Sequence, residues 1–210
     1  MRGSGLVHLL SRAASRTSTR GYAGASATRL RATVTALGAD PTRAELSIRS
    51  EPLPSLPSGA VLVEVQAAAV HWVDCLMLAG QYQHAPPLPY TPGMEYSGVV
   101  TAVAPDVSTT SCAVGDRISV DIFNAGPRSY GAYQQEGGFA THAIAPCKGL
   151  RRIPDAMSFE EAASFSGAYE TAHHALVHCV SGLKPATRMV LCPASLSTLA
   201  PLSVTRRCPS

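Results

Sequence analysis

Pro92-Gly93-Met94-Glu95-Tyr96-Ser97-Gly98-Val99-Val100 is the stretch of sequence that decides the fold. From Tyr96 to Val103 its composition is that of a β-strand, because valine and aromatic side chains fit a pleated, half-buried surface. Further strands are expected at residues 61–67, 118–122 and 137–144, with a proline-punctuated strand edge and loop at 46–57. Short strands divided by glycine and proline favour a small antiparallel β-barrel or sandwich.

The sequence changes character after Ile153-Pro154-Asp155. Ser158 is followed three residues later by Glu161, and this spacing is typical of a capping box at the start of a helix. The helical stretch is expected to run to about residue 180, in two pieces broken near Gly167. Residues 189–191 then predict the start of a buried strand.

The N-terminal residues resemble an import signal. Residues 1–31 carry six arginines and no acidic residue, with serine and threonine throughout and leucines at helical spacing. An Arg-rich, acid-free amphipathic segment is what organelle import machinery recognises. We therefore expect a leader at residues 1–28 that directs the protein to mitochondria, with plastids as the alternative destination and an ordinary disordered terminus as the plain interpretation.

Charge and cysteine content exclude several classes of function. Setting aside the six arginines of residues 1–31 leaves 11 basic residues against 14 acidic ones, so a nucleic-acid-binding surface is not expected. No apolar run is long enough for a membrane span. The six cysteines are scattered without a Cys-x-x-Cys pair, which predicts reduced thiols and neither a disulfide framework nor a structural zinc site.

Several local patterns occur in an order that resembles the medium-chain dehydrogenase/reductase superfamily, in its zinc-independent, quinone oxidoreductase-like branch, over about residues 30–191. The most specific is the Pro-Gly-x-Glu-x-x-Gly-Val-Val segment. The others are His71-Trp72-Val73-Asp74 with Gly80-Gln81-Tyr82, Val114-Gly115-Asp116-Arg117, Ile153-Pro154-Asp155 and Tyr169-Glu170-Thr171-Ala172-His173-His174-Ala175-Leu176.

The resemblance implies a mainly β fold with some α. A GroES-like β-barrel catalytic domain is expected at residues 29–155, followed at 156–191 by the first helix and strand of a Rossmann domain that binds NADPH. In zinc-dependent members of the superfamily a Cys, a His and a second Cys hold the metal. Here His71 stands at the first Cys position and Met94 at the His position. Because a thioether is a poor zinc ligand, no zinc is expected.

The resemblance also suggests site residues. Tyr82 is expected to donate a hydrogen bond to a carbonyl oxygen as hydride arrives, although an amphipathic tyrosine at the rim fits equally well. Thr171 matches a threonine close to the nicotinamide, and its alternative is a helix-interior threonine bonded to its own backbone. His71 and Asp74 complete the candidate catalytic set. Asp74 orients its neighbours or begins a helix, and Glu95 is interpreted as a structural carboxylate.

The expected cofactor loop is missing from the sequence. All 17 glycines lie at or before Gly182, so the strand at 189–191 is not followed by the glycine-rich loop that approaches a dinucleotide's diphosphate. Residues 192–210 have no clear periodicity and are expected to be an unrelated tail from another reading frame or a retained intron. Because the Rossmann domain is incomplete, we do not expect the family's homodimer for this chain.

Three functions follow as expectations. The first is NADPH-dependent reduction of quinones or α,β-unsaturated carbonyls, impaired by the missing loop. The second is a non-catalytic GroES-like fragment or binding module. The third is mitochondrial reduction of 2-enoyl thioesters.

Overall fold

The computed structural model describes residues 28–108 and 110–179. The leader up to residue 27, the strand expected at 189–191 and the tail at 192–210 therefore lie outside the described residues. The chain divides into one unit that ends at Glu170 and a second that begins at Thr171. In the described ranges, no helix has the length and apolar character that crossing a bilayer requires.

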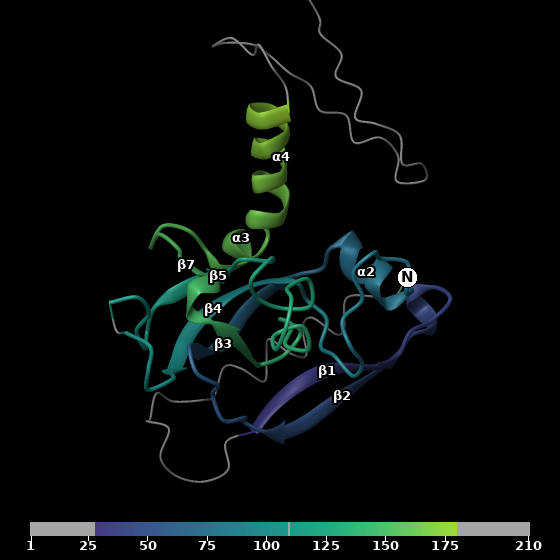
Figure 1. Cartoon of the computed structure of the whole chain (residues 1–210), viewed down its shortest axis with the longest axis horizontal. Coiled ribbons are helices and arrows are strands. Elements are labelled where there is room, and N and C mark those ends of the chain that lie inside the picture. The colour runs from purple at the N-terminus through teal and green to yellow at the C-terminus, as the bar shows by residue number, and fades with distance from the viewer. Residues whose placement is uncertain (1–27, 109, 180–210) are drawn as a thin grey trace, which may run out of the picture. The chain divides into compact units, whose positions relative to one another are not determined.

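Two antiparallel sheets make up the first unit (Figure 1). One has two strands, β1 and β2. The other has five strands in the order β6-β3-β4-β5-β7, and every neighbouring pair is antiparallel. The strands are β1 (Thr28–Ala36), β2 (Glu45–Pro52), β3 (Ala60–Ala69), β4 (Glu95–Val103), β5 (Arg117–Val120), β6 (His142–Pro146) and β7 (Leu150–Arg152).

Short helices lie between the strands and after the last of them. The first unit has α2 (Trp72–Leu78), α3 (Phe159–Ala163), the 3-10 turns η1 (Pro41–Arg43) and η2 (Cys147–Gly149), and the π-helix η3 (Ser166–Glu170). In the second unit, residues 171–179 are described, and they form α4 (Thr171–His174) and the π-helical η4 (Ala175–Cys179). Mainly β architecture with some helix is what the sequence predicted.

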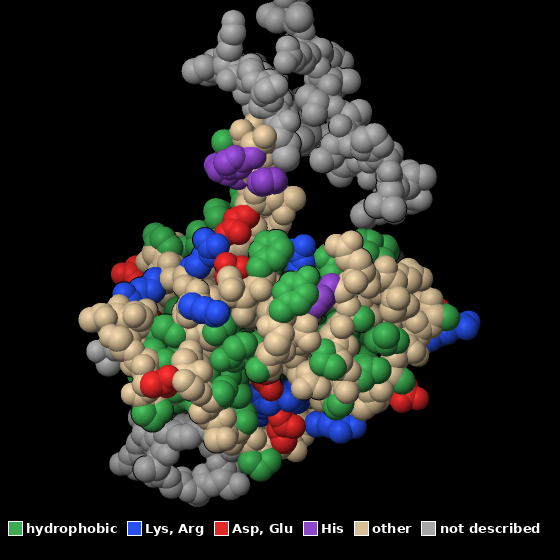
Figure 2. All heavy atoms as spheres, in the orientation of Figure 1, with side chains coloured by type: hydrophobic (Ala, Val, Ile, Leu, Met, Phe, Trp, Pro, Cys, Tyr) green, Lys and Arg blue, Asp and Glu red, His purple; other side chains and the backbone are tan. Residues whose placement is uncertain are grey.

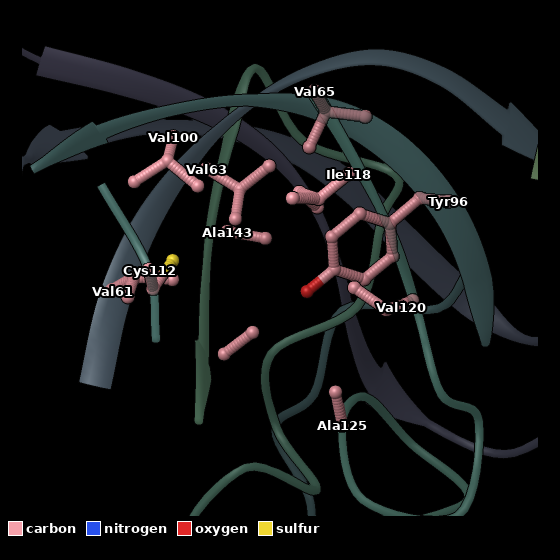
Figure 3. Close-up of a cluster of buried hydrophobic side chains, with 11 residues drawn as sticks. Val61, Val63, Val65, Tyr96, Val100, Cys112, Ile118, Val120, Ala125 and Ala143 are labelled. Atoms are coloured by element: carbon pink, nitrogen blue, oxygen red, sulfur yellow. The ribbon is translucent and has the colours of Figure 1, made fainter. Parts of the chain in front are cut away.

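The central core is a valine-rich cluster on one face of the five-stranded sheet (Figure 3). Val61, Val63 and Val65 point to this face, as their spacing predicts, and pack with Tyr96 and Val100. Ala60 and Leu62 alternate with these valines on β3 and form a second cluster with Ile144 of β6 on the opposite face. β3 is therefore buried on both sides, which explains its nearly continuous apolar sequence.

The strands expected around the quoted segment are confirmed at β3 and β4, and β5 ends two residues earlier than expected. The prediction of a strand at 137–144 is wrong for residues 137–141, since β6 begins at His142. Residues 137–139 instead pass close to the segment that contains Gly93 and Tyr96. The backbone N–H of Gly138 donates to Gly93 O at 2.7 Å, and a Cβ on Gly138 would lie 2.5 Å from Cβ of Tyr96. Only glycine fits this crossing.

The capping box is confirmed at the start of α3. Ser158 Oγ accepts from the N–H of Glu161 at 3.1 Å, and the N–H of Ser158 donates to Glu161 Oε2 at 2.9 Å. The helix packs on the five-stranded sheet, where Ser97 Oγ donates to the carbonyl of Phe159 at 2.6 Å. The helical stretch breaks after Ala163 and resumes at Ser166, which confirms the break expected near Gly167.

Two arginines assigned by composition to the N-terminal positive segment belong to the fold. Arg29 and Arg31 lie on β1, with side chains only 3% and 11% exposed, and both bond to Glu51 and Glu136. Treating all six arginines of residues 1–31 as a separate charge was therefore wrong for these two. Their acidic partners lie far along the sequence, and composition alone does not indicate such pairs.

Candidate functional site

His71 sits at the start of helix α2, where the backbone leaves strand β3. It is the N-cap residue, with extended backbone angles (φ −93°, ψ 155°), and its N–H donates to Asp74 Oδ2 at 3.0 Å. The side chain is 23% exposed, and its Nε2 lies 2.5 Å from Glu95 Oε2. The imidazole therefore contacts the protein interior and still reaches the surface.

Glu95 is the buried partner of this histidine. Its side chain is fully buried at the first position of β4, where one oxygen bonds His71 and the other accepts the N–H of Gly167 at 2.9 Å. A carboxylate removed from water is costly unless charged or hydrogen-bonding groups surround it. Both oxygens meet that condition. Glu95 thus joins α2, β4 and the π-helix η3, in agreement with a structural carboxylate.

Asp74 holds the two segments that bring His71 and Glu95 together. Its side chain is buried, and Oδ1 accepts the N–H groups of Gly93 and Met94 at 3.0 and 3.2 Å while Oδ2 accepts that of His71. Burial raises the pKa of Asp74, although these hydrogen bonds oppose the shift. Asp74 therefore both begins the helix and orients its neighbours, so the two interpretations of its sequence position coexist.

The turn before Glu95 requires glycine. Gly93 has φ +96°, and a Cβ there would lie 2.7 Å from the backbone nitrogen of Phe139. This left-handed conformation is accessible mainly to glycine. The Pro-Gly-x-Glu pattern of the sequence thus has a local cause: the glycine makes the turn, Asp74 holds it, and Glu95 emerges toward His71.

Gly167 closes the site from the side of η3. A Cβ at this position would lie 2.8 Å from Glu95 Oε2 and 3.3 Å from His71 Cε1, so the absence of a side chain allows the close approach. Phe165 and Tyr169 flank it and stack with ring centroids 4.7 Å apart. Single-turn π-helical segments occur frequently at functional sites.

Exposed apolar residues surround the polar pair in sequence. Val70 is 66% exposed and Trp72 is 53% exposed, directly before and after His71. Phe165 and Tyr169 are exposed on the η3 side. Figure 2 shows hydrophobic side chains reaching the surface in several patches. Phe165 and Tyr169 line a groove with Pro154 and Met157, and exposed aromatic rings suit a planar, weakly polar ligand better than a charged one.

Tyr82 is half-buried and packs with Val34, Met77 and Tyr90. Because Met77 belongs to α2, this cluster supports the helix that begins at His71, which agrees with an amphipathic rim residue. The hydroxyl of Tyr90 is enclosed here and has no hydrogen-bond partner among the residues described. Burial, followed by the charge of Asp74, raises the pKa of Tyr90.

The model for the alcohol dehydrogenase GroES-like domain matches residues 57–155. Quinone oxidoreductase-like protein 2 from Mus musculus is 37% identical over 145 residues, covering 69% of this chain and 37% of the relative. Human quinone oxidoreductase is 32% identical over 134 residues, covering 63% and 37%. A mycobacterial protein solved with NADPH aligns with a TM-score of 0.58 at 26% identity, covering 75% of this chain and 43% of that one.

The chain belongs to the medium-chain dehydrogenase/reductase superfamily, as a quinone oxidoreductase-like member. The resemblance found in the sequence is confirmed. The chain spans about a third of the length of the curated relatives it matches, between 32% and 37% for the quinone oxidoreductases.

Within this quinone oxidoreductase-like chain, the structure brings two of the four candidate residues together. His71 and Asp74 share one hydrogen-bonded group, and Tyr82 lies on the cluster beneath α2. Thr171 opens α4 in the second unit and is exposed there. Gly167 was not singled out as a site residue, and the sequence carried only a weak signal for it, a glycine inside a helical pattern.

The donor set at the family's metal position differs from a zinc site. His71 is paired with Glu95, and Met94 is buried nearby with a thioether that competes poorly for zinc. No group of three or more His, Cys, Asp or Glu side chains that could hold a metal ion occurs within the described ranges. The expectation of zinc independence stays a prediction.

Proposed function

We propose that the protein is an NADPH-dependent reductase of quinones or α,β-unsaturated carbonyls, with residues 28–170 forming its substrate side. The observation that carries this proposal is the His71–Glu95 pair, whose inner member is fully buried and whose outer member is 23% exposed. Family membership supports the reaction class, and the exposed ring of Trp72, next to His71 in the sequence, supports a planar substrate.

In this proposal His71 donates a hydrogen bond, and then a proton, to the carbonyl oxygen of the substrate. Reduction of an enone or quinone leaves negative charge on a carbonyl oxygen, and that oxygen needs a hydrogen-bond donor and then a proton. An imidazole backed by a carboxylate can provide both, because Glu95 stabilises the positive charge on the ring before the proton leaves. Asp74 acts as a positioning residue by fixing the backbone at His71 and at the turn before Glu95.

NADPH, when bound, would supply the hydride. Thr171, an exposed residue at the start of α4, matches the family's threonine for the nicotinamide end and is proposed for that role. The glycine-rich loop that usually supports the diphosphate end does not follow residues 189–191, because no glycine occurs after Gly182 in this sequence. We therefore propose weak NADPH binding. We also propose that the reaction uses no zinc, since Met94 replaces an imidazole ligand.

The test measures NADPH oxidation by the full chain at micromolar to millimolar NADPH, with a benzoquinone, a short enone and a 2-enoyl thioester as substrates. We expect turnover that does not saturate at micromolar NADPH, and a loss of about 100-fold in kcat/KM for His71→Ala. Glu95→Gln is the matched variant that keeps the shape and removes the charge.

Each result has a separate meaning. Saturation at low micromolar NADPH would contradict weak binding without affecting the substrate assignment. A preference for the thioester would favour enoyl thioester reduction. Absence of turnover with all three substrates would favour a non-catalytic binding module.

From the leader we further propose import into mitochondria, with plastids as the alternative. Residues 1–28 fused to a fluorescent protein should direct it to that organelle. Diffuse fluorescence would contradict the proposal.

A further inference from the structure

Strand β2 forms an open edge of the two-stranded sheet (Figure 1). Its inner side pairs with β1 along its whole length, and β1 in turn bonds on its other side to Tyr90 and Phe139. Among the described residues, no segment pairs with the outer side of β2. An unpaired strand edge presents free N–H and C=O groups to which another strand can bind.

The register of the sheet shows which residues of β2 present these groups. The N–H groups of Ala32 and Val34 on β1 donate away from β2, at 2.8 Å each. Residues directly opposite in an antiparallel pair point their backbone groups either toward each other or both away. Ile48 lies opposite Ala32, and Leu46 lies opposite Val34. The backbone groups of Leu46 and Ile48 therefore point to the open side of β2.

The side chains of β2 fit a second copy of the same strand. Leu46 and Ile48 are large apolar side chains that are 40% and 45% exposed, on one face of the strand. Glu45 and Arg49 are exposed on the other face. In the part of the chain that the structure describes, each of these two charges bonds a hydroxyl group and neither has an ion-pair partner. A strand of the same sequence running in the opposite direction supplies the missing partner to both.

We propose that β2 pairs antiparallel with β2 of a second copy of this chain, across a two-fold axis at Ser47. In this register Glu45 lies opposite Arg49 of the partner subunit, and Leu46 lies opposite Ile48 of the partner subunit. Both contacts occur twice. The backbone groups that join the strands are those of Leu46 and Ile48, which point outward. Because the contact uses the open edge of both copies, assembly closes at the dimer.

Charge selects this register over its neighbours. Moving the axis to Ile48 would place Glu45 opposite Glu51 of the partner subunit, and moving it to Arg49 would place two arginines opposite each other. Like charges directly opposite in a sheet are destabilising. Moving the axis to Leu46 leaves only residues 45–47 of the strand in the pairing and no pair of opposite charges.

The pairing is expected to be weak and reversible. It joins residues 45–49 of each copy, far fewer than the roughly 20–30 residues a side of a standard interface. We therefore expect monomer at about 1 µM and a substantial fraction of dimer at several hundred micromolar. Added salt should weaken the dimer, because the two ion pairs are near the surface. Since the pairing uses only β2, it can form in a chain for which the family's homodimer is not expected.

The experiment is sedimentation velocity of the full chain from about 1 to 500 µM, which should show a monomer–dimer equilibrium. Glu45→Arg and Arg49→Glu should each raise the Kd at least about 10-fold, because each variant places two pairs of like charges opposite each other. An equimolar mixture of the two variants should dimerise as the wild type does, since every facing pair is then of opposite charge. Glu160→Arg, at an exposed position on α3, is the control and should leave the Kd unchanged.

A cysteine at the axis tests the register directly. Facing residues in a non-hydrogen-bonded pair have Cα atoms about 4.5 Å apart, within the range of a disulfide. Ser47→Cys should therefore form a covalent dimer on mild oxidation, above the level of the wild type. Ser50→Cys should not, because the two copies of that residue would lie about 20 Å apart.

Four results would each overturn the proposal. They are a monomer at every concentration up to 500 µM, a Kd that neither charge reversal changes, a mixture of the two reversed variants that stays monomeric, and equal cross-linking of Ser47→Cys and Ser50→Cys.

Discussion

Arg29 and Glu136 form a two-point ion pair between residues 107 positions apart, with Nη1–Oε2 at 2.6 Å and Nη2–Oε1 at 3.0 Å. The arginine lies on β1, and the glutamate directly precedes residues 137–139, which pass close to Tyr96. Arg31 and Glu51 extend the pair into a four-residue network. Burial opposes the charge on Glu51, but the hydrogen bonds from both arginines outweigh it and lower its pKa. The network links the two-stranded sheet of β1 and β2 to Glu136, which lies outside that sheet.

The first prediction concerns this ion pair. Glu136→Gln should lower the free energy of unfolding by about 2 kcal/mol, because Arg29 remains charged and buried while Glu51 alone balances it. Denaturant unfolding of the full chain measures the loss. Glu45→Gln removes an exposed carboxylate on β2 and should change stability by less than about 0.5 kcal/mol. Equal effects of the two substitutions would refute the role of burial.

The second prediction is a dependence of stability on pH through His142. Burial, and then the charge of Arg29, lower the pKa of His142 below its ordinary value of about 6.5. In the window between the lowered value and 6.5 the unfolded chain binds more protons, so stability falls as pH drops through that window. His142→Gln should flatten this slope between pH 7.5 and 5.5, measured by denaturant unfolding.

The comparison of slopes isolates His142, because Glu51 and Asp74 are the same in both proteins. His173→Gln is the control, since that histidine is exposed on α4. If the parent and His142→Gln have parallel pH profiles, the buried histidine does not contribute.

The third prediction concerns Asp74. Asn at this position can accept at one oxygen, but its amide would point an N–H toward one of the three backbone donors. We expect Asp74→Asn to cost about 2 kcal/mol of unfolding free energy. Asp40→Asn is the matched control, because Asp40 caps η1 in an exposed turn and asparagine caps equally well. A similar small cost at both positions would show that the Asp74 contacts are not needed.

The strands and the helix start were predictable because their causes are local. Alternating valines on β3 and the Ser158–Glu161 spacing are patterns within a few residues. Strand β1 was not singled out, because its two arginines looked like an extension of the leader. Their pairing depends on partners 22 and 107 positions away, and a single sequence contains no local signal for such pairs.

The site was predictable in part for the same reason. His71 and Asp74 lie in one motif, and the Pro-Gly-x-Glu segment pointed to Glu95. The motifs did not indicate that Asp74 bonds both the start of α2 and the turn before Glu95. They also did not indicate that Glu95 accepts the N–H of Gly167, 72 positions later. These contacts arise from the crossing of α2, β4 and η3, which only the three-dimensional arrangement reveals.

The last prediction tests that crossing at Gly167. Gly167→Ala places a methyl group 2.8 Å from Glu95 Oε2 and 3.3 Å from His71 Cε1, so the carboxylate must move and the pair must loosen. We expect a loss of about 1–3 kcal/mol in unfolding free energy, with changed NMR signals from the His71 ring. Ala168→Ser adds one atom at the next, exposed position and should leave both unchanged. If Gly167→Ala preserves the stability and the His71 signals, η3 does not approach the pair as closely as the contacts indicate, and the support it gives to Glu95 is dispensable.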